Sequence, residues 1–338
     1  MRIESRPALS NGRLPRVAEA ESSRPRQAAP NLRSPGHTPA PPRLRQDPWP
    51  VRWGLTLAAV GIVGLLVVVP VVHVFSQALA DGPGAYVRNL VGDPDTRHAL
   101  LLTATVAPVA VGANLVFGVA AAWAIARFRF PGRTVLITLI DLPFAVSPVV
   151  AGLMLVLVFG LQGWLGGWLR SHGVSVIFAT PGLILATAFV TLPFVARELI
   201  PVLEAVGPDE ELAAVSLGAG PWQTFWRVTL PNIKWGLLYG VILCHARAIG
   251  EFGAVHVVSG RIAGQTDTVP LRVEKLFQEY NTPGSFAVAS VLTLAALMTL
   301  VIKVGLERRA ARPSHPLPLR GEVSRWSPFS RGGERGRG

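Results

Sequence analysis

Six apolar stretches, each long enough to cross a bilayer as a helix, constrain this chain more than any other feature. A helix needs about 20 mainly apolar residues to cross about 30 Å of hydrocarbon. Only helices and closed barrels satisfy their backbone hydrogen bonds there. The stretches lie near residues 53–75, 100–125, 135–159, 176–195, 235–258 and 286–306. The sequence therefore predicts an all-α polytopic membrane protein with six transmembrane helices.

The positive charge of the chain lies almost entirely outside these stretches. Residues 1–52 hold ten arginines against four acidic residues and residues 307–338 hold eight against three, which accounts for nearly all of the net charge of +12. The charge is therefore a property of the ends, and we expect no nucleic-acid partner. We predict disordered tails at 1–50 and 307–338 around a transmembrane domain at 51–306.

The orientation of the spans follows from the connection RFRFPGR between the second and third stretches. It carries Arg127, Arg129 and Arg133 and no acidic residue. Short loops rich in Arg and Lys stay in the cytoplasm. Counting from this loop places both termini and the loop at 197–233 in the cytoplasm.

The loop at 197–233 contains a predicted helix-turn-helix that begins with acidic residues, DEELAAVSLGAGPWQTFWRVTLP. Pro208 can open a first helix whose acidic first turn suits the positive end of the helix dipole. Gly218 permits a left-handed turn. Pro221 opens a second helix, and we expect Thr229 and Pro231 to open a third. The second helix places its large apolar residues on one face, Trp222, Phe225, Trp226 and Val228.

A DNA-binding helix-turn-helix has a similar outline. Its second helix reads base edges with hydrogen-bonding side chains. Here that helix presents Trp222, Phe225 and Trp226 and lies between two membrane spans, which argues against binding to DNA.

The spacing resembles that of the cytoplasmic coupling loop of ABC importer permeases. The pattern of that loop is E-A-A, then three residues, a glycine, nine residues and I-x-L-P. The glutamate of that pattern falls on Leu212, with Glu210 and Glu211 just before it. A shift of one residue turns a helix by about 100°, so Glu211 need not occupy the same face. The resemblance implies an ATPase-coupling set of Glu211, Ala213, Ala214, Gly218, Val228, Leu230 and Pro231.

Charged residues within the fifth stretch are the main candidates for an anion path. Arg247 and Glu251 lie four residues apart on one face, and a lone charge at that depth costs about 3 kcal/mol or more. They either form an internal ion pair that locks the helices or contribute to an anion path. Ser147 is a third candidate, because Pro143 and Pro148 can break the helix around it.

The external segment after the fifth stretch reads as an amphipathic helix. Asp267 or Thr268 can cap it, Pro270 lies in its first turn, and Leu271, Leu276 and Phe277 supply apolar contacts. It either packs on the outer ends of the spans or docks an external solute-binding protein. The docking candidates are Arg272, Glu274 and Lys275.

The sequence shows no catalytic or metal-binding motif. It has no G-x-x-x-x-G-K-[ST] phosphate loop, H-E-x-x-H, C-x-x-C or G-x-S-x-G pattern. The single cysteine, Cys244, lies among apolar residues, which suggests a buried thiol. We expect no enzyme activity, no metal and no cofactor in this chain, with ATP and Mg²⁺ bound by a partner ATPase.

A narrower resemblance covers residues 225–291 and the LPFAVSPVVAG segment. These resemble sulfate/thiosulfate permease subunits of the CysW type, although ARAIGEFGA is shared with molybdate permeases. The resemblance implies a bacterial inner-membrane importer with a second homologous permease subunit, an ATPase dimer, a periplasmic sulfate-binding protein and surrounding lipid. Two alternatives stay open: a permease for molybdate, tungstate or another oxyanion, and a self-sufficient channel or secondary transporter. The latter needs no docking helix, and ion-coupled carriers usually show several intramembrane acids or repeats.

Overall fold

The computed structural model describes residues 49–310, and every regular element among them is a helix. The chain divides into two units, one ending at Ile62 and the other beginning at Val63. The predicted tails lie outside the described residues except at their inner ends. Helix α1 begins at Trp49 and α13 ends at Ala310, so the helical part extends past the predicted limits of 51–306.

Four helices are long and apolar enough to span a membrane unbroken. They are α1 (Trp49–Ala78), α3 (Pro94–Arg127), α7 (Thr180–Val206) and α13 (Thr282–Ala310). The two remaining predicted spans are each a pair of helices joined at a bend. The all-α membrane architecture with up to six spans is confirmed.

The third span breaks between α4 (Arg133–Ala145) and α5 (Pro148–Phe159), where the chain bends by 110°. Pro143 lies inside α4 and does not end it. Pro148 opens α5, and Ser147 before it is extended, with φ −58° and ψ 135°. A residue that precedes proline avoids the helical region, so Pro148 is the proline at the break.

The fifth span bends by 52° between α10 (Leu230–Ile249) and α11 (Gly253–Ser259). At its other end the chain stays helical from α9 (Pro221–Thr224) through a π-helical turn, η2 (Phe225–Thr229), into α10. Helix α10 begins where it was predicted, with Thr229 at the N-cap position and Pro231 in its first turn, but no break separates it from η2. Pro231 offers no N–H to a preceding carbonyl, and the wider π turn keeps the helix continuous past it.

Three helices form the core of the second unit. α3 packs along α7, and α10 packs against both. The contact is close: a Cβ on Gly118 of α3 would lie 2.7 Å from Cβ of Val195 on α7. Buried Asn114 donates to the Thr191 hydroxyl at 2.8 Å, so this polar group joins two helices, as such groups do within membranes.

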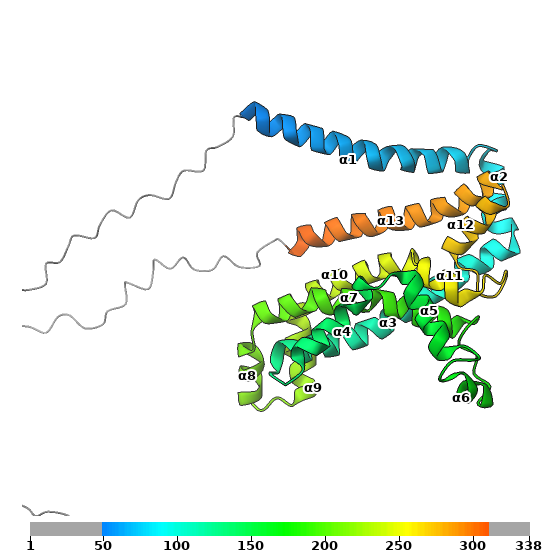
Figure 1. Cartoon of the computed structure of the whole chain (residues 1–338). Helices are drawn as coiled ribbons and strands as arrows, with labels where there is room; N and C mark the ends of the chain where they lie inside the picture. The colour runs from blue at the N-terminus through cyan, green and yellow to red at the C-terminus, as the bar shows by residue number, and fades with distance from the viewer. Residues whose placement is uncertain (1–48, 311–338) are drawn as a thin grey trace, which may run out of the picture. The chain divides into compact units, whose positions relative to one another are not determined.

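The short elements lie at opposite ends of this core (Figure 1). At one end are α8 (Asp209–Ser216) and α9. At the other are α6 (Gly166–Ser171) and α12 (Val269–Gln278), with α12 packed on α13. The first connection forms α2 (Pro83–Val87) and a π-helical turn, η1 (Arg88–Gly92). The predicted coupling segment and the predicted external helix therefore lie far apart across the spans.

Candidate functional site

The segment from α8 to α9 forms the predicted helix-turn-helix. Gly218 stands at φ +87° with nothing within 4 Å of an added Cβ, so backbone conformation alone favours glycine there. Around the turn, large apolar side chains are exposed: Leu212, Val215, Leu217 and Trp222. Exposed apolar residues grouped in this way mark an interaction surface.

Glu211 anchors this segment to the membrane helices. Its carboxylate accepts hydrogen bonds from Arg127 of α3, at 2.9 and 3.1 Å, and from the Thr229 hydroxyl at 2.9 Å. The Arg127 and Glu211 side chains are only 8% and 16% exposed. Leu212, which holds the glutamate position of the family pattern, is exposed instead. The one-residue departure thus turns Glu211 inward and Leu212 outward.

Arg127 also binds the end of α7. Its Nη1 donates to the Leu203 carbonyl and its Nη2 to the Gly207 carbonyl, both at 2.8 Å. The Leu203 carbonyl also accepts from the Gly207 amide, at 3.2 Å, so Arg127 adds a side-chain donor at the helix end, where backbone donors run short. Sequence reasoning used Arg127 only for orientation and missed this role, although the predicted topology places it on the same side of the membrane as the acidic run Asp209–Glu211.

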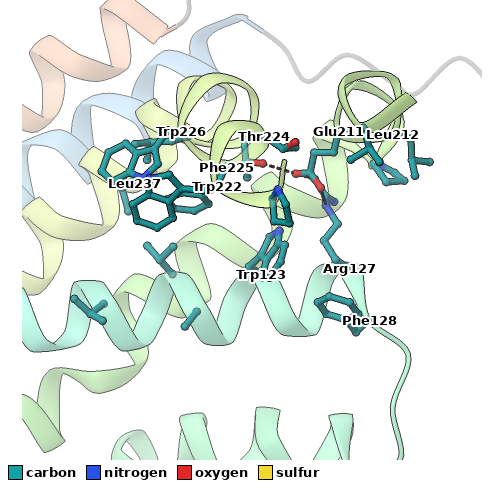
Figure 2. Close-up of a pocket in the computed structure, with 18 of the residues that line it drawn as sticks. Trp123, Arg127, Phe128, Glu211, Leu212, Trp222, Thr224, Phe225, Trp226 and Leu237 are labelled. Atoms are coloured by element: carbon teal, nitrogen blue, oxygen red, sulfur yellow. Dashed lines mark hydrogen bonds and ion pairs between the residues drawn. The ribbon is translucent and has the colours of Figure 1, made fainter. Parts of the chain in front are cut away.

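A largely apolar cavity of about 990 Å³ lies beside the ion pair. Figure 2 shows Arg127 reaching toward Glu211, with tryptophans of α3, α9 and η2 along the cavity. The wall comprises Trp123, Trp222, Phe225, Trp226 and Leu237 together with the apolar face of α3. Of the other coupling candidates, Ala213 and Pro231 are exposed, and Ala214, Val228 and Leu230 are partly buried.

Arg247 and Glu251 form the ion pair that their spacing predicts, with Nη1 and Oε2 2.6 Å apart. The two atoms form an ion pair but are not aligned for a hydrogen bond, so Glu251 Oε2 has no hydrogen-bond partner among the described residues. The other oxygen, Glu251 Oε1, accepts from the Ala254 amide at 3.0 Å. Glu251 is 1% exposed and Arg247 35%. The pair therefore bridges the bend between α10 and α11, and its part in an anion path stays a prediction.

The two helix breaks lie against each other. A Cβ on Gly253 would lie 2.9 Å from Cβ of Pro148, and one on Gly152 would lie 2.8 Å from the Ala254 carbonyl oxygen. Ser147, exposed at the first break, makes no capping bond with its side chain. The structure thus brings the segment of Ser147 next to the segment of Glu251.

A family model described as "Binding-protein-dependent transport system inner membrane component" matches residues 114–312. The chain belongs to this permease family. Two curated relatives are named "Sulfate transport system permease protein CysW". The one from Escherichia coli (strain K12) is 51% identical over 281 residues, 80% of this chain and 96% of the relative. The one from Synechococcus elongatus is 53% identical over 264 residues, which cover 77% of this chain and 92% of the relative.

The fold of the permease also matches a solved structure. A bacterial ABC transporter involved in the import of the acidic polysaccharide alginate has a chain that aligns with a TM-score of 0.62 at 16% identity. The match covers 78% of the permease and 96% of that chain. At this identity the likeness concerns the fold alone, an ABC importer permease fold, and it agrees with the helices described above.

Helix α12 of the permease, the predicted external helix, differs from its prediction in three ways. Arg272 is not available to a docking rim, because it is 6% exposed and bonded to Asp93 and Thr96 of the segment that begins α3. Thr268 holds the N-cap position but makes no side-chain capping bond. Phe277 is 61% exposed rather than packed, whereas the predicted apolar contacts of Leu271 and Leu276 are buried.

The two other docking candidates lie nearer the surface of the permease. Glu274 is paired with Arg261 at 3.2 Å, with His256 Nδ1 3.4 Å from the same carboxylate. Lys275 is partly buried. Both remain predictions for docking.

Asp267 is a buried carboxyl just before α12. It is 1% exposed, and neither oxygen has a hydrogen-bond partner among residues 49–310. Burial raises the pKa of Asp267 above its ordinary value, although the charges of Lys275, Arg272 and Arg261 oppose that rise. The ionised form is therefore poorly accommodated in the folded permease.

This carboxyl predicts a pH dependence of stability. Because the pKa of Asp267 is raised in the folded state, protonation stabilises the fold as pH falls through that pKa. The gain in the free energy of unfolding is complete below the pKa of the unfolded chain, about 3.9. We expect the advantage of Asp267→Asn over the wild type, measured as thermal unfolding of the solubilised complex, to be largest at pH 7.5 and smaller at pH 5. A constant difference between the two proteins across this range would contradict the assignment.

Proposed function

We propose that this permease moves sulfate across the bacterial inner membrane into the cytoplasm, as one subunit of an ATP-driven importer. The observation that carries the transport role is the coupling segment, anchored by Glu211 and Arg127 and exposing apolar residues at its tip. Support for sulfate comes from relatives about half identical to this chain over nearly their whole length, whose names specify sulfate transport.

The exposed tip suits a cytoplasmic ATPase. Leu212, Val215 and Leu217 offer an apolar contact surface, and the sequence has no phosphate loop of its own. The ATPase pair would supply ATP and Mg²⁺. A second homologous permease subunit would complete the path, and a periplasmic sulfate-binding protein would dock beside Glu274 and Lys275. Both termini would then lie in the cytoplasm.

The contacts of Arg127 suggest how ATPase closure reaches the spans. Movement of α8 would displace Glu211. Through its bond to Arg127, Glu211 would move α3 and the end of α7. Through its bond to Thr229, it would move the start of α10. Those three helices form one packed core. Coupling also requires that nucleotide and anion prefer different conformations, since equal affinity for both shifts nothing.

The proposal is tested by uptake of radiolabelled sulfate in cells that lack their own sulfate permeases. The chain is expressed with and without its candidate partner subunits, at matched levels. Uptake that needs the ATPase supports the proposal. Uptake of molybdate without sulfate would move the substrate to another oxyanion, and uptake by this chain alone would contradict an ATPase-coupled permease.

Gly218 supplies a matched pair of variants for the coupling step. Gly218→Val places a β-branched residue at φ +87°, which costs about 1–2 kcal/mol or more, so we expect sulfate uptake to fall about tenfold or more. Gly218→Asn is expected to retain more than half, because asparagine tolerates this region. Equal losses in both variants, with the complex assembled, would rule out backbone conformation as the reason for glycine.

A further inference from the structure

A polar stripe runs along one face of α4 inside an otherwise apolar span. Thr134, Thr138 and Asp141 follow one another at four- and three-residue spacing, which keeps them on one face, and both threonines are exposed. Across from it, α7 exposes Arg197, Pro201 and Glu204 at the same spacing. Beyond Asp141, α4 ends at the break where Ser147 is exposed.

Two ion pairs join α4 to the exposed face of α7. Arg133 contacts Glu204 at 2.8 Å. Further along, Arg197 donates from Nε and Nη2 to the two oxygens of Asp141, at 2.6 and 2.8 Å. The guanidinium also lies 5.3 Å from the ring centroid of Phe144. This planar, two-bond arrangement fixes the Arg197 side chain in place.

The Arg197–Asp141 pair is exposed at a depth where lipid would surround it. Its side chains are 57% and 30% exposed. At about 1.5 Å per residue, Asp141 lies about 12 Å along α4 from Arg133, and Arg197 about 10 Å along α7 from Glu204. Half of the hydrocarbon thickness is about 15 Å. Charges at this depth face protein or water rather than lipid, so this face of α4 and α7 is not lipid-facing.

We propose that Arg197, held by Asp141, is an anion-binding position on the inner half of the transport path, between the break at Ser147 and the cytoplasm. The inference rests on the proposed function and deepens it, because it assigns a position for a tetrahedral oxyanion. Nη1 of Arg197 makes no hydrogen bond within residues 49–310 and can donate to such an anion.

Asp141 gives this position the weak affinity that passage requires. Its negative charge offsets that of Arg197, so an anion that binds the guanidinium is also able to leave. Transport paths need sites that are favourable enough to enter and weak enough to release. By contrast, the carboxylate of the Arg247–Glu251 pair is 1% exposed and accepts a hydrogen bond from the Ala254 amide of α11. The inner pair is the more accessible of the two.

Water access to the stripe is tested with single cysteines. Cys244 is the only cysteine of the chain and is buried, so Cys244→Ala gives a clean background. In the assembled complex in inverted vesicles, we expect a charged thiol reagent to label Thr138→Cys and sulfate to slow the labelling. The neighbour Leu139→Cys, exposed but off the stripe, is expected to stay unlabelled. Absence of Thr138→Cys labelling both with and without ATP would overturn the proposal.

The binding role is tested with the double variant Asp141→Leu/Arg197→Met. Replacing an ion pair by apolar residues leaves no unpaired charge and is often neutral for stability. We therefore expect an assembled complex whose ATP-dependent sulfate uptake falls about tenfold or more, and partial activity in Arg197→Lys. Wild-type uptake by the double variant would overturn the proposal, as would failure to assemble, which would make this face the contact with the second permease.

The two failures are distinguishable in the same experiment. A wild-type complex that takes up no sulfate would contradict the proposed function. A wild-type complex that imports sulfate, with a double variant that does so equally well, would contradict only the role of Arg197. The thiol labelling reports water access to the stripe whichever oxyanion is carried.

Discussion

Replacing Glu211 by alanine is expected to lower ATP-dependent uptake at least about tenfold. The change removes both bonds from Arg127 and the bond from Thr229. It leaves the guanidinium of Arg127, whose side chain is 8% exposed, without its counter-charge. Loss of one partner from a buried pair costs about 3 kcal/mol or more, which is enough to detach α8 from α3 and α10. Uptake and ATPase activity are measured together in proteoliposomes.

The neighbouring Glu210 is the matched control. It is exposed, and its side chain hydrogen-bonds only with Asn232 among the described residues, so Glu210→Ala should stay within about twofold of the wild type, as surface changes usually do. ATP hydrolysis that continues in Glu211→Ala without uptake would place the defect in coupling. Equal effects of the two substitutions would mean that the anchor is not specific to Glu211.

The double variant Arg127→Met/Glu211→Leu separates stability from coupling. An apolar pair restores packing without an unpaired charge, so thermal stability should recover relative to Glu211→Ala. Uptake should stay low, because methionine cannot donate to the Leu203 and Gly207 carbonyls that Arg127 binds. Recovery of uptake along with stability would show that Arg127 and Glu211 only compensate each other.

Local signals predicted the spans and the coupling turn well. Hydrophobic length identified six apolar segments because the bilayer requires about 20 residues for each helix. Gly218 was predictable because the pattern needs a left-handed residue and its structural φ is +87°. The continuity of α9 into α10 was not, because prolines at 221 and 231 suggested two helix starts and a π-helical turn has no sequence signal that we can identify.

Pairings between distant segments were beyond single-sequence reasoning. Arg127 meets Glu211, Arg197 meets Asp141 and Arg272 meets Asp93 through tertiary structure. Arg247 and Glu251 were predictable as a pair, because they lie only four residues apart in the sequence. The same limit explains the wrong assignment of Arg272 to a docking rim: a charged residue on an amphipathic helix suggests a solvated surface until the partner that buries it is known.

Replacing Arg272 by methionine is expected to release helix α12 from the start of α3. Arg272 bonds to Asp93 and Thr96, lies 3.7 Å from Asp95, and is almost fully buried. Its loss leaves Asp93 and Asp95, whose side chains are 31% and 40% exposed, without their cation, at a cost of about 1.5–3 kcal/mol for the lost hydrogen bonds to a charged group. Faster hydrogen exchange across 269–278 in the assembled complex would show this release. Lys275→Met is the control on the same helix, since Lys275 has no ion pair among the described residues.

The Asp93 end of this pair fixes the pH range in which the effect is seen. Burial raises the Asp93 pKa, but hydrogen bonds from Thr96 and Arg272 outweigh it and hold the pKa below its ordinary value. A lowered folded pKa stabilises above the unfolded value of about 3.9 and is lost only as pH falls through the folded value. The difference in hydrogen exchange between wild type and Arg272→Met should therefore have its full size at pH 7 and the same size at pH 5. A difference that vanishes by pH 5 would mean that Asp93 is not the group that Arg272 stabilises.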